Sequence, residues 1–340
     1  MFLEIKNIGI IKEANIKIDG LTVIAGENDT GKSTVGKVLY SLIKTVTFSS
    51  NIEPKDLPMG NIYQYHFDMY TKKLFKNKIS KNGSIKFDFE DNIFELKIKQ
   101  NRCISFEYPP KYKNTKAKMF KPLLIDSPLI WNMYETLETI NSVKNQESIM
   151  DNIDFSISQT IQDLHFALSV KMKDNYSNNL SLKINNIIGG SFEQDGLGNF
   201  SFNKDDDKIE LINTSMGIKY FGILQVLENK NHLHHDQILI LDEPEVHLHP
   251  KWQLMLAEVI VKLVKSGVKI VVNSHSPYMI EALELFSKRH EVKSNYYLSE
   301  KNENGTSNIT SQGEDLNYIY KKLAQPFTTL EEMALKDFKW

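Results

Sequence analysis

The stretch that decides the fold is Gly26-Glu27-Asn28-Asp29-Thr30-Gly31-Lys32-Ser33, a full match to the pattern G-x-x-x-x-G-K-[ST]. It follows the mostly apolar residues 21–25 and precedes apolar residues at helical spacing, which are Val35, Val38, Leu39, Leu42 and Val46. A strand that passes through such a loop into a helix presents backbone N–H groups and the positive end of the helix dipole to a phosphate. The stretch therefore predicts a site for ATP or GTP. The alternative, a glycine-rich turn that binds nothing, leaves the flanking strand and helix unexplained.

The residues of this loop have separate predicted roles. Lys32 is expected to reach the β- and γ-phosphates and to act in catalysis, and Ser33 is expected to hold Mg²⁺. The full set of predicted nucleotide-binding residues in the loop is Gly26, Glu27, Asn28, Asp29, Thr30, Gly31, Lys32, Ser33 and Thr34.

Composition places the chain among ordinary globular proteins. Its 340 residues are 41% hydrophobic and 25% charged, enough for one large core or two modest ones. The net charge of −2 gives no global argument for binding nucleic acid or a membrane. The sequence has no apolar run of roughly 18 residues that would span a bilayer, and its start lacks a signal-peptide pattern. Cys103 is the single cysteine, so we expect no intrachain disulfide and a cytoplasmic location.

A second chemical motif follows another apolar strand. Residues 238–241 are apolar and end in Asp242 and Glu243. A buried parallel strand delivers the side chains at its carboxyl end to the edge of the sheet where ligands bind. We therefore predict that Asp242 holds Mg²⁺ and that Glu243 orients or deprotonates the attacking water. Alone, such a strand could simply end in solvated acids, but the phosphate loop upstream favours the functional interpretation.

Two further segments extend the predicted site. His275 follows the next strand, in the run Asn273-Ser274-His275-Ser276-Pro277, where it can contact a γ-phosphate and act in catalysis. Ser215 is a good N-cap for a helix that begins near Gly217, and the start of that helix is a second anion site. The alternatives are a structural histidine and ordinary helix capping.

The pattern of elements predicts an α/β fold. From residue 215, helix and strand alternate: helix 215–229, strand 238–241, helix 250–265, strand 268–273, helix 277–287 and strand 295–299. This alternation is typical of a parallel sheet with crossover helices. Upstream, residues 85–107 alternate like a β-meander, residues 131–173 are mostly helical, and residues 181–212 show a β pattern.

These motifs, in this order, resemble those of ABC-type ATPases of the RecF/SMC/OLD-like branch. Asp242-Glu243-Pro244-Glu245-Val246-His247-Leu248-His249-Pro250 is similar to the Walker B and D-loop segment of that branch, and residues 273–277 to its switch-histidine segment. The resemblance implies a head-to-tail dimer, in which each ATP lies on the loop of one subunit and is capped by Ser215 and Gly217 of the other. The chain keeps only the Ser-x-Gly core of the LSGGQ signature, and the Q-loop glutamine is not evident. We expect the Q-loop after the strand that ends at Asp126-Ser127-Pro128.

The resemblance also suggests an organisation of the chain. We predict an ABC-ATPase head, with a P-loop parallel sheet core, an antiparallel β portion and a helical lobe. The predicted regions are a nucleotide-binding core (1–48 and 205–300), a β-rich portion with an insertion (49–130), a helical lobe that leads to the signature region (131–204) and a C-terminal extension (301–340).

Members of this branch work in phage defence, such as the Septu ATPase PtuA, or are fused to a Toprim nuclease. Only residues 276–340 follow His275, too few for such a nuclease domain. We therefore expect an ATP-dependent homodimer or higher oligomer that regulates a partner effector, a nuclease or toxin encoded nearby, in antiviral defence. The alternative is a RecF-like factor that binds DNA for repair, and a transporter subunit fits less well. No membrane partner is expected.

Three smaller signals remain open. A basic segment with aromatic residues could follow a DNA or RNA backbone, although a solvated loop is the simpler interpretation; it contains Tyr108, Lys111, Tyr112, Lys113, Lys116, Lys118, Phe120 and Lys121. His232, His234 and His235 could bind a metal, but we see no cysteine or acid at ligand spacing. His247 and His249 are predicted to lie at the dimer interface.

Overall fold

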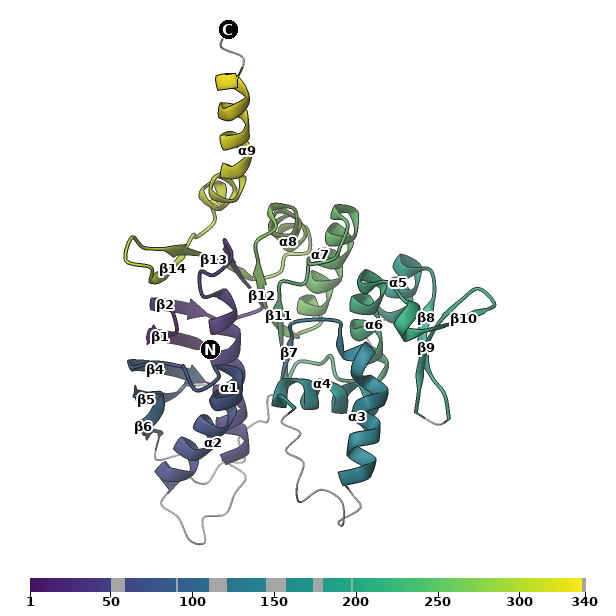
Figure 1. The fold of residues 1–340 in the computed structure, drawn as a ribbon, viewed down its shortest axis with the longest axis horizontal. Coiled ribbons are helices and arrows are strands. Elements are labelled where there is room, and N and C mark those ends of the chain that lie inside the picture. The colour runs from purple at the N-terminus through teal and green to yellow at the C-terminus, as the bar shows by residue number, and fades with distance from the viewer. Residues whose placement is uncertain are drawn as a thin grey trace.

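A computed structural model describes residues 1–49, 59–89, 91–109, 121–144, 157–173, 180–196 and 198–337 (Figure 1). An 11-stranded sheet forms its centre, and a separate 3-stranded sheet lies at one side. The central sheet has the strand order β6-β5-β4-β1-β2-β14-β13-β3-β12-β11-β7.

One half of the central sheet is parallel. Its strands are β13 (Ser294–Lys301), β3 (Leu21–Gly26), β12 (Lys269–Ser274), β11 (Gln237–Asp242) and β7 (Lys121–Ile125). Each pairs in parallel with its neighbour, so that Leu241 lies opposite Val272 on one side and opposite Ile125 on the other. The carboxyl ends of these strands therefore meet at one edge, where ligands bind in such sheets.

The other half of the sheet is antiparallel. Its strands are β1 (Phe2–Ile8), β2 (Ile11–Lys17), β4 (Asn82–Phe89), β5 (Asn92–Lys99) and β6 (Arg102–Glu107). The strand β14 (Ser307–Ser311) joins the halves, because it pairs in parallel with β2 and antiparallel with β13. The predicted β-meander at residues 85–107 is confirmed as β4, β5 and β6.

Helices cover both faces of the parallel half of the central sheet, whereas the core of the antiparallel half lies on one face. The first face packs against α1 (Lys32–Ser49) and α2 (Met59–Leu74), and the second against α6 (Met216–Asn229), α7 (Pro250–Lys265) and α8 (Pro277–Arg289). Strand β3 shows why the chain forms two cores. Ile24 belongs to the core under α1, while Val23 and Ala25 belong to the core on the opposite face, as alternate side chains of a strand must.

Smaller elements form a lobe beside β7 (Figure 1). They are the helices α3 (Ile130–Lys144), α4 (Gln159–Ser169) and α5 (Leu180–Ile188) and the strands β8 (Ser191–Gln194), β9 (Phe200–Lys204) and β10 (Asp207–Glu210). The β pattern that we predicted for residues 181–212 is wrong at its start, where the chain forms α5. The buried residues Leu180, Ile184 and Ile188 recur every four positions, which is a helical period.

The alternation predicted from residue 215 onward is confirmed for each helix and strand, and with it the α/β class, the parallel core and the antiparallel portion. The predicted C-terminal extension supplies β14 to the central sheet and then forms α9 (Asn317–Asp337). Among the residues that the structure describes, no helix is long and apolar enough to cross a membrane.

Candidate nucleotide-binding site

The phosphate loop connects β3 to α1 at the carboxyl edge of the parallel strands. Gly31 has φ +98°, and a side chain there would place its Cβ 2.8 Å from Cγ1 of Ile11. Only glycine therefore fits this turn. The loop is tied to β13, because the hydroxyl of Ser299 donates to the carbonyl of Thr30 at 2.7 Å and Lys301 pairs with Asp29 at 2.5 Å. Glu27 and Asn28 are exposed at the tip of the loop.

Lys32 lies at the centre of this loop. Its Nζ donates to the carbonyl oxygens of Gly26 at 2.8 Å and Glu27 at 2.6 Å. Only 3% of the lysine is exposed, and burial lowers its pKa, although the carboxylates of Glu243 and Asp242 act against that shift. The Glu243 carboxylate lies farther from this ammonium, at 3.7 Å, and a bound phosphate would compensate the desolvated charge more closely.

The residues predicted to hold a metal come together. The hydroxyl of Ser33 donates to Oδ1 of Asp242 at 3.0 Å, although the two residues are 209 positions apart in the chain. The amide of Asn273 donates to the same oxygen at 2.8 Å. A hydroxyl and a carboxylate beside a phosphate loop are the oxygen donors that suit Mg²⁺. Ser33 and Asp242 therefore fit the Mg²⁺ that the phosphate loop implies. Thr34 lies in the first turn of α1, where its N–H donates to the carbonyl of Gly31 at 3.0 Å.

Glu243 and His275 face each other across this site. Oε1 of Glu243 lies 3.7 Å from Nζ of Lys32 and 3.4 Å from Nδ1 of His275. The backbone of Glu243 has φ +49°, which non-glycine residues seldom adopt, and its N–H donates to the carbonyl of Asn273 at 2.9 Å. Strained backbone of this kind is concentrated at functional sites. All three predicted catalytic residues, Lys32, Glu243 and His275, therefore lie within one cluster.

Glu245 is a residue of this cluster that our sequence reasoning missed. Its Oε1 accepts hydrogen bonds from the hydroxyl of Ser274 at 2.7 Å and from the N–H groups of His275 at 2.8 Å and Ser276 at 3.2 Å. Its side chain is buried. The sequence does contain a signal for this residue, because Glu245 is the third acid in the run Asp242-Glu243-Pro244-Glu245. An acid so close to a buried strand can itself be buried, and it then needs hydrogen-bond partners.

Asp126 follows β7, where we expected the Q-loop. It comes one residue after Ile125, which pairs with Leu241, so Asp126 and Asp242 leave neighbouring strands at the same edge. Desolvation, and next the nearby carboxylate of Asp242, raise the pKa of Asp126. A cation bound at this edge would therefore stabilise the ionised form of Asp126.

The start of α6 carries Ser215 and Gly217. Ser215 is exposed and caps the helix, since its Oγ accepts from the N–H of Ile218 at 3.4 Å. Gly217 is buried, and a Cβ there would lie 3.1 Å from both Leu248 and Trp252. No contact joins these two residues to the phosphate loop of the same chain among the described residues. Their role as a cap for a partner's nucleotide stays a prediction, and close packing gives Gly217 a separate structural reason.

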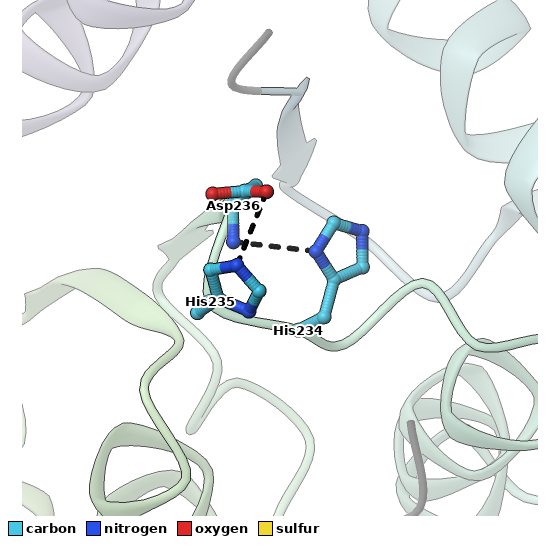
Figure 2. Close-up of side chains that lie close together, drawn as sticks. All are labelled: His234, His235 and Asp236. Atoms are coloured by element: carbon cyan, nitrogen blue, oxygen red, sulfur yellow. Dashed lines mark hydrogen bonds and ion pairs between the residues drawn. The ribbon is translucent and has the colours of Figure 1, made fainter. Parts of the chain in front are cut away.

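The histidine segment before β11 forms the cluster in Figure 2. His234, His235 and Asp236 place one ligand atom each within 4.8 Å of one another, so an acid does lie beside the histidines, contrary to our sequence reading. Nδ1 of His234, however, already accepts from the backbone N–H of Asp236 at 3.2 Å. Nε2 of His235 also lies 3.3 Å from Oδ2 of Asp236. His232 is turned elsewhere, with its Nε2 2.7 Å from the carbonyl of Val170.

The remaining predicted positions are partly described. His249 caps α7 through its Nδ1, which accepts from the N–H of Lys251 at 3.3 Å, and His247 is exposed with φ +68°. Of the basic segment, only Tyr108 and Lys121 are described; the other predicted residues at 111–120 lie outside the described residues.

Comparisons with known proteins agree with this geometry. Residues 21–281 match the model of the family described as "AAA domain, putative AbiEii toxin, Type IV TA system". No curated protein sequence matches the chain. One similar solved structure is an Smc head bound to the C-terminal winged-helix domain of ScpA, with a TM-score of 0.54, 14% identity, and coverage of 94% of this chain and 98% of that chain. Another is an Smc head with an extended coiled coil bound to the C-terminal domain of ScpA, derived from Pyrococcus furiosus, with a TM-score of 0.53, 14% identity and 98% coverage of both chains.

The structural likeness concerns the fold, and the family match spans most of the sequence. The match includes the phosphate loop, the Asp242–Glu243 pair and His275. The chain therefore belongs to the AAA_21 family of AAA domains, and its fold is similar to that of Smc head domains.

Proposed function

We propose that this protein binds and hydrolyses ATP with Mg²⁺, that ATP joins two copies of it, and that the cycle regulates a partner effector. The observation that carries the proposal is the cluster of Lys32, Asp242, Glu243 and His275 at one edge of the sheet, around the turn at Gly31. The buried ammonium of Lys32 lies 3.7 Å from the Glu243 carboxylate, and a phosphate bound in the loop would give it a closer anionic partner.

The residues of the cluster divide the work of hydrolysis. The N–H groups of the loop and Nζ of Lys32 bind the β- and γ-phosphates, and Glu243 accepts a proton from the attacking water. His275 donates a hydrogen bond to the γ-phosphate and is held in place through Glu245. Mg²⁺, when bound through Ser33 and Asp242, neutralises charge on the phosphates. A general base of this kind typically contributes about 10²- to 10⁴-fold to the rate.

The dimer gives the exposed N-terminus of α6 a role. Ser215 is exposed there and contacts no phosphate loop of its own chain within the described residues. In a head-to-tail pair, the helix N-terminus and the Ser215 hydroxyl would meet the γ-phosphate on the partner subunit. Bound ATP then holds the two subunits together, and hydrolysis allows them to separate.

Mass photometry of the Glu243→Gln variant tests this proposal. The variant keeps the shape of the side chain but removes the base, so ATP with Mg²⁺ is expected to shift it from monomer to dimer while hydrolysis falls by about 100-fold or more. The matched control is Glu303→Gln, an exposed acid outside the site, which should hydrolyse ATP like the wild type. A wild-type rate in Glu243→Gln would contradict the assignment of the base.

Ser215→Arg tests the capping role separately. The added side chain obstructs the start of α6, so the double variant with Glu243→Gln should bind ATP but remain monomeric. A mass unchanged by ATP in Glu243→Gln alone would point to a constitutive oligomer or to a different dimer.

The effector is a protein partner, a nuclease or toxin encoded nearby, and the context is antiviral defence in the cytoplasm. Two findings support this part: the family description refers to a putative toxin of a toxin–antitoxin system, and the Smc heads of similar fold were solved with a protein partner, ScpA. Purification of the protein with its native gene neighbours tests it, and a co-eluting small protein is the expected result. ATP-dependent, salt-sensitive binding to DNA or RNA would instead favour the RecF-like alternative.

A further inference from the structure

Several buried polar atoms near the nucleotide site have no hydrogen-bond partner in the described part of the chain. Among them are Oε2 of Glu245 and the hydroxyl of Tyr220 on α6. Both residues are only 3% exposed. Since the great majority of buried polar atoms are paired, an unpaired acceptor and an unpaired donor in one region call for an explanation.

The two atoms belong to neighbouring groups. Burial raises the pKa of Tyr220 well above its ordinary value, and the carboxylate of Glu245 adds the largest contribution of any charge, ahead of Asp242 and Asp126. A phenol beside a carboxylate is a natural donor–acceptor pair, and a charge-assisted O–H···O⁻ bond is about 2.5–2.7 Å long. The packing supports this neighbourhood, because Gly217 at the start of α6 contacts Leu248, and the N–H of Leu248 donates to the carbonyl of Glu245 at 3.0 Å.

Each partner controls a different part of the proposed dimer. Tyr220 lies five residues after Ser215, whose exposed hydroxyl would cap the nucleotide of the partner subunit. Glu245 holds the loop of its own His275 through the backbone N–H groups of His275 and Ser276. A bond between them would therefore connect the partner's ATP with the residue that contacts the chain's own ATP.

Packing contacts also connect the start of α6 with the loop of His275. Gly217 of α6 packs directly on Leu248 and Trp252. Nε2 of Gln253 donates to the carbonyl of Leu248 at 3.1 Å, and the hydroxyl of Ser276 donates to Oε1 of Gln253 at 2.6 Å. The start of α6, the start of α7 and the His275 loop thus form one contiguous packed unit.

We propose that Tyr220 and Glu245 are positioning residues that form a hydrogen bond when ATP closes the dimer, and that this bond couples the two nucleotide sites. The inference rests on the proposed ATP-dependent dimer. Docking of a nucleotide-bearing partner on α6 moves the Tyr220 hydroxyl onto Oε2 of Glu245, and the carboxylate then fixes the loop of His275. Coupling of this kind is reciprocal, so ATP at either site favours the competent form of the other.

Tyr220→Phe tests the bond, because it removes the hydroxyl and leaves the ring. The hydroxyl has no hydrogen-bond partner among the described residues, so the melting temperature of the variant should stay the same or rise. ATP affinity of the monomer should also be unchanged. The Hill coefficient for ATP hydrolysis is expected to fall from near two toward one. The control is Tyr296→Phe, a buried tyrosine of β13, which should keep the wild-type cooperativity.

The imidazole signals of His275 in NMR spectra give a readout that a purely structural role would not affect. In the Glu243→Gln background, ATP with Mg²⁺ should shift these signals, and the shift should be reduced when Tyr220→Phe is added. The double variant Tyr220→Phe/Glu245→Gln should have the same Hill coefficient as Glu245→Gln alone.

Unchanged cooperativity and an unchanged His275 shift in Tyr220→Phe would overturn the proposed bond. That outcome is distinct from a failure of the proposed function, which would appear as the absence of an ATP-dependent dimer in Glu243→Gln with Tyr220 intact.

Discussion

The parallel and antiparallel halves of the central sheet differ in where they place polar side chains. In β3 and β12, nearly every residue is buried, and the phosphate loop and His275 follow directly after their carboxyl ends. Buried and exposed residues alternate in β5 from Ile93 to Lys99 and in β2 from Ala14 to Lys17. The first pattern is typical of strands covered on both faces, and the second of strands covered on one face.

This difference shows how a single sheet can separate chemistry from support. The parallel half brings Lys32, Asp242 and His275 to one edge because its strands share a direction. The antiparallel half ends its strands alternately at both edges and contributes a core of aromatic rings, with Phe94 between Phe87 and Phe106 at centroid distances of 6.4 and 6.3 Å. We therefore expect substitutions in the two halves to separate stability from nucleotide binding.

The largest effect is expected from Phe94→Ala in the antiparallel half. Phe94 is fully buried, and loss of such a ring typically costs about 3–5 kcal/mol of the free energy of unfolding. Urea denaturation should show this loss, while ATP affinity measured well below the unfolding midpoint should stay within about twofold of wild type. A parallel fall in ATP affinity would mean that the two halves are not independent.

A smaller effect on stability but a larger one on binding is expected from Lys32→Ala in the parallel half. A charge-assisted contact to phosphate is worth about 1.5–3 kcal/mol, so ATP affinity should fall about 10- to 100-fold. Titration with a fluorescent ATP analogue measures it. The control is Lys86→Ala in β4, a partly exposed lysine that pairs with Glu95 at 3.0 Å, which should leave ATP affinity unchanged. Equal losses in both variants would remove the contrast between the halves.

Much of this arrangement follows from the sequence, and the exceptions have physical causes. The phosphate loop and Asp242 were predictable because the pattern and its flanking strands set both residue type and place. Glu245 was not, because its importance depends on contacts with Ser274 and Ser276, 29 and 31 residues away. Long-range pairing of a buried charge has no local signature.

Two other differences come from short segments. The helix α5 has only 9 residues, too few for its period to stand out from the β pattern that follows. The role of Gly217 in packing against Trp252 depends on tertiary structure, and the Ser-x-Gly core alone suggests only an anion site. Local sequence therefore defines the loop and the strand ends, and packing decides which neighbouring residues support them.

The smallest effect is expected from Asp126→Asn, which examines the acidic edge of the parallel half. Desolvation and the Asp242 carboxylate raise the pKa of Asp126, so its ionised form disfavours the folded state. A carboxyl whose folded pKa is raised stabilises the fold fully below its unfolded pKa, near 3.8, and loses that contribution as the pH rises through the folded value. The variant without bound nucleotide should therefore melt about 1–2 °C higher than wild type at pH 8, with no difference near pH 3.5.

Melting curves between pH 3.5 and pH 8 measure this effect, and Asp88→Asn in β4 is the control from the antiparallel half. If Asp126 lies beside the bound cation, Mg²⁺ with ATP should reverse the order of stability, because the cation favours the carboxylate over the amide. A variant that is less stable than wild type at pH 8 without nucleotide would show that Asp126 is stabilised by a contact rather than strained by Asp242. Asp126 would then be a residue that stabilises the fold, like the residues of the antiparallel half, and not a residue whose carboxylate needs a bound cation.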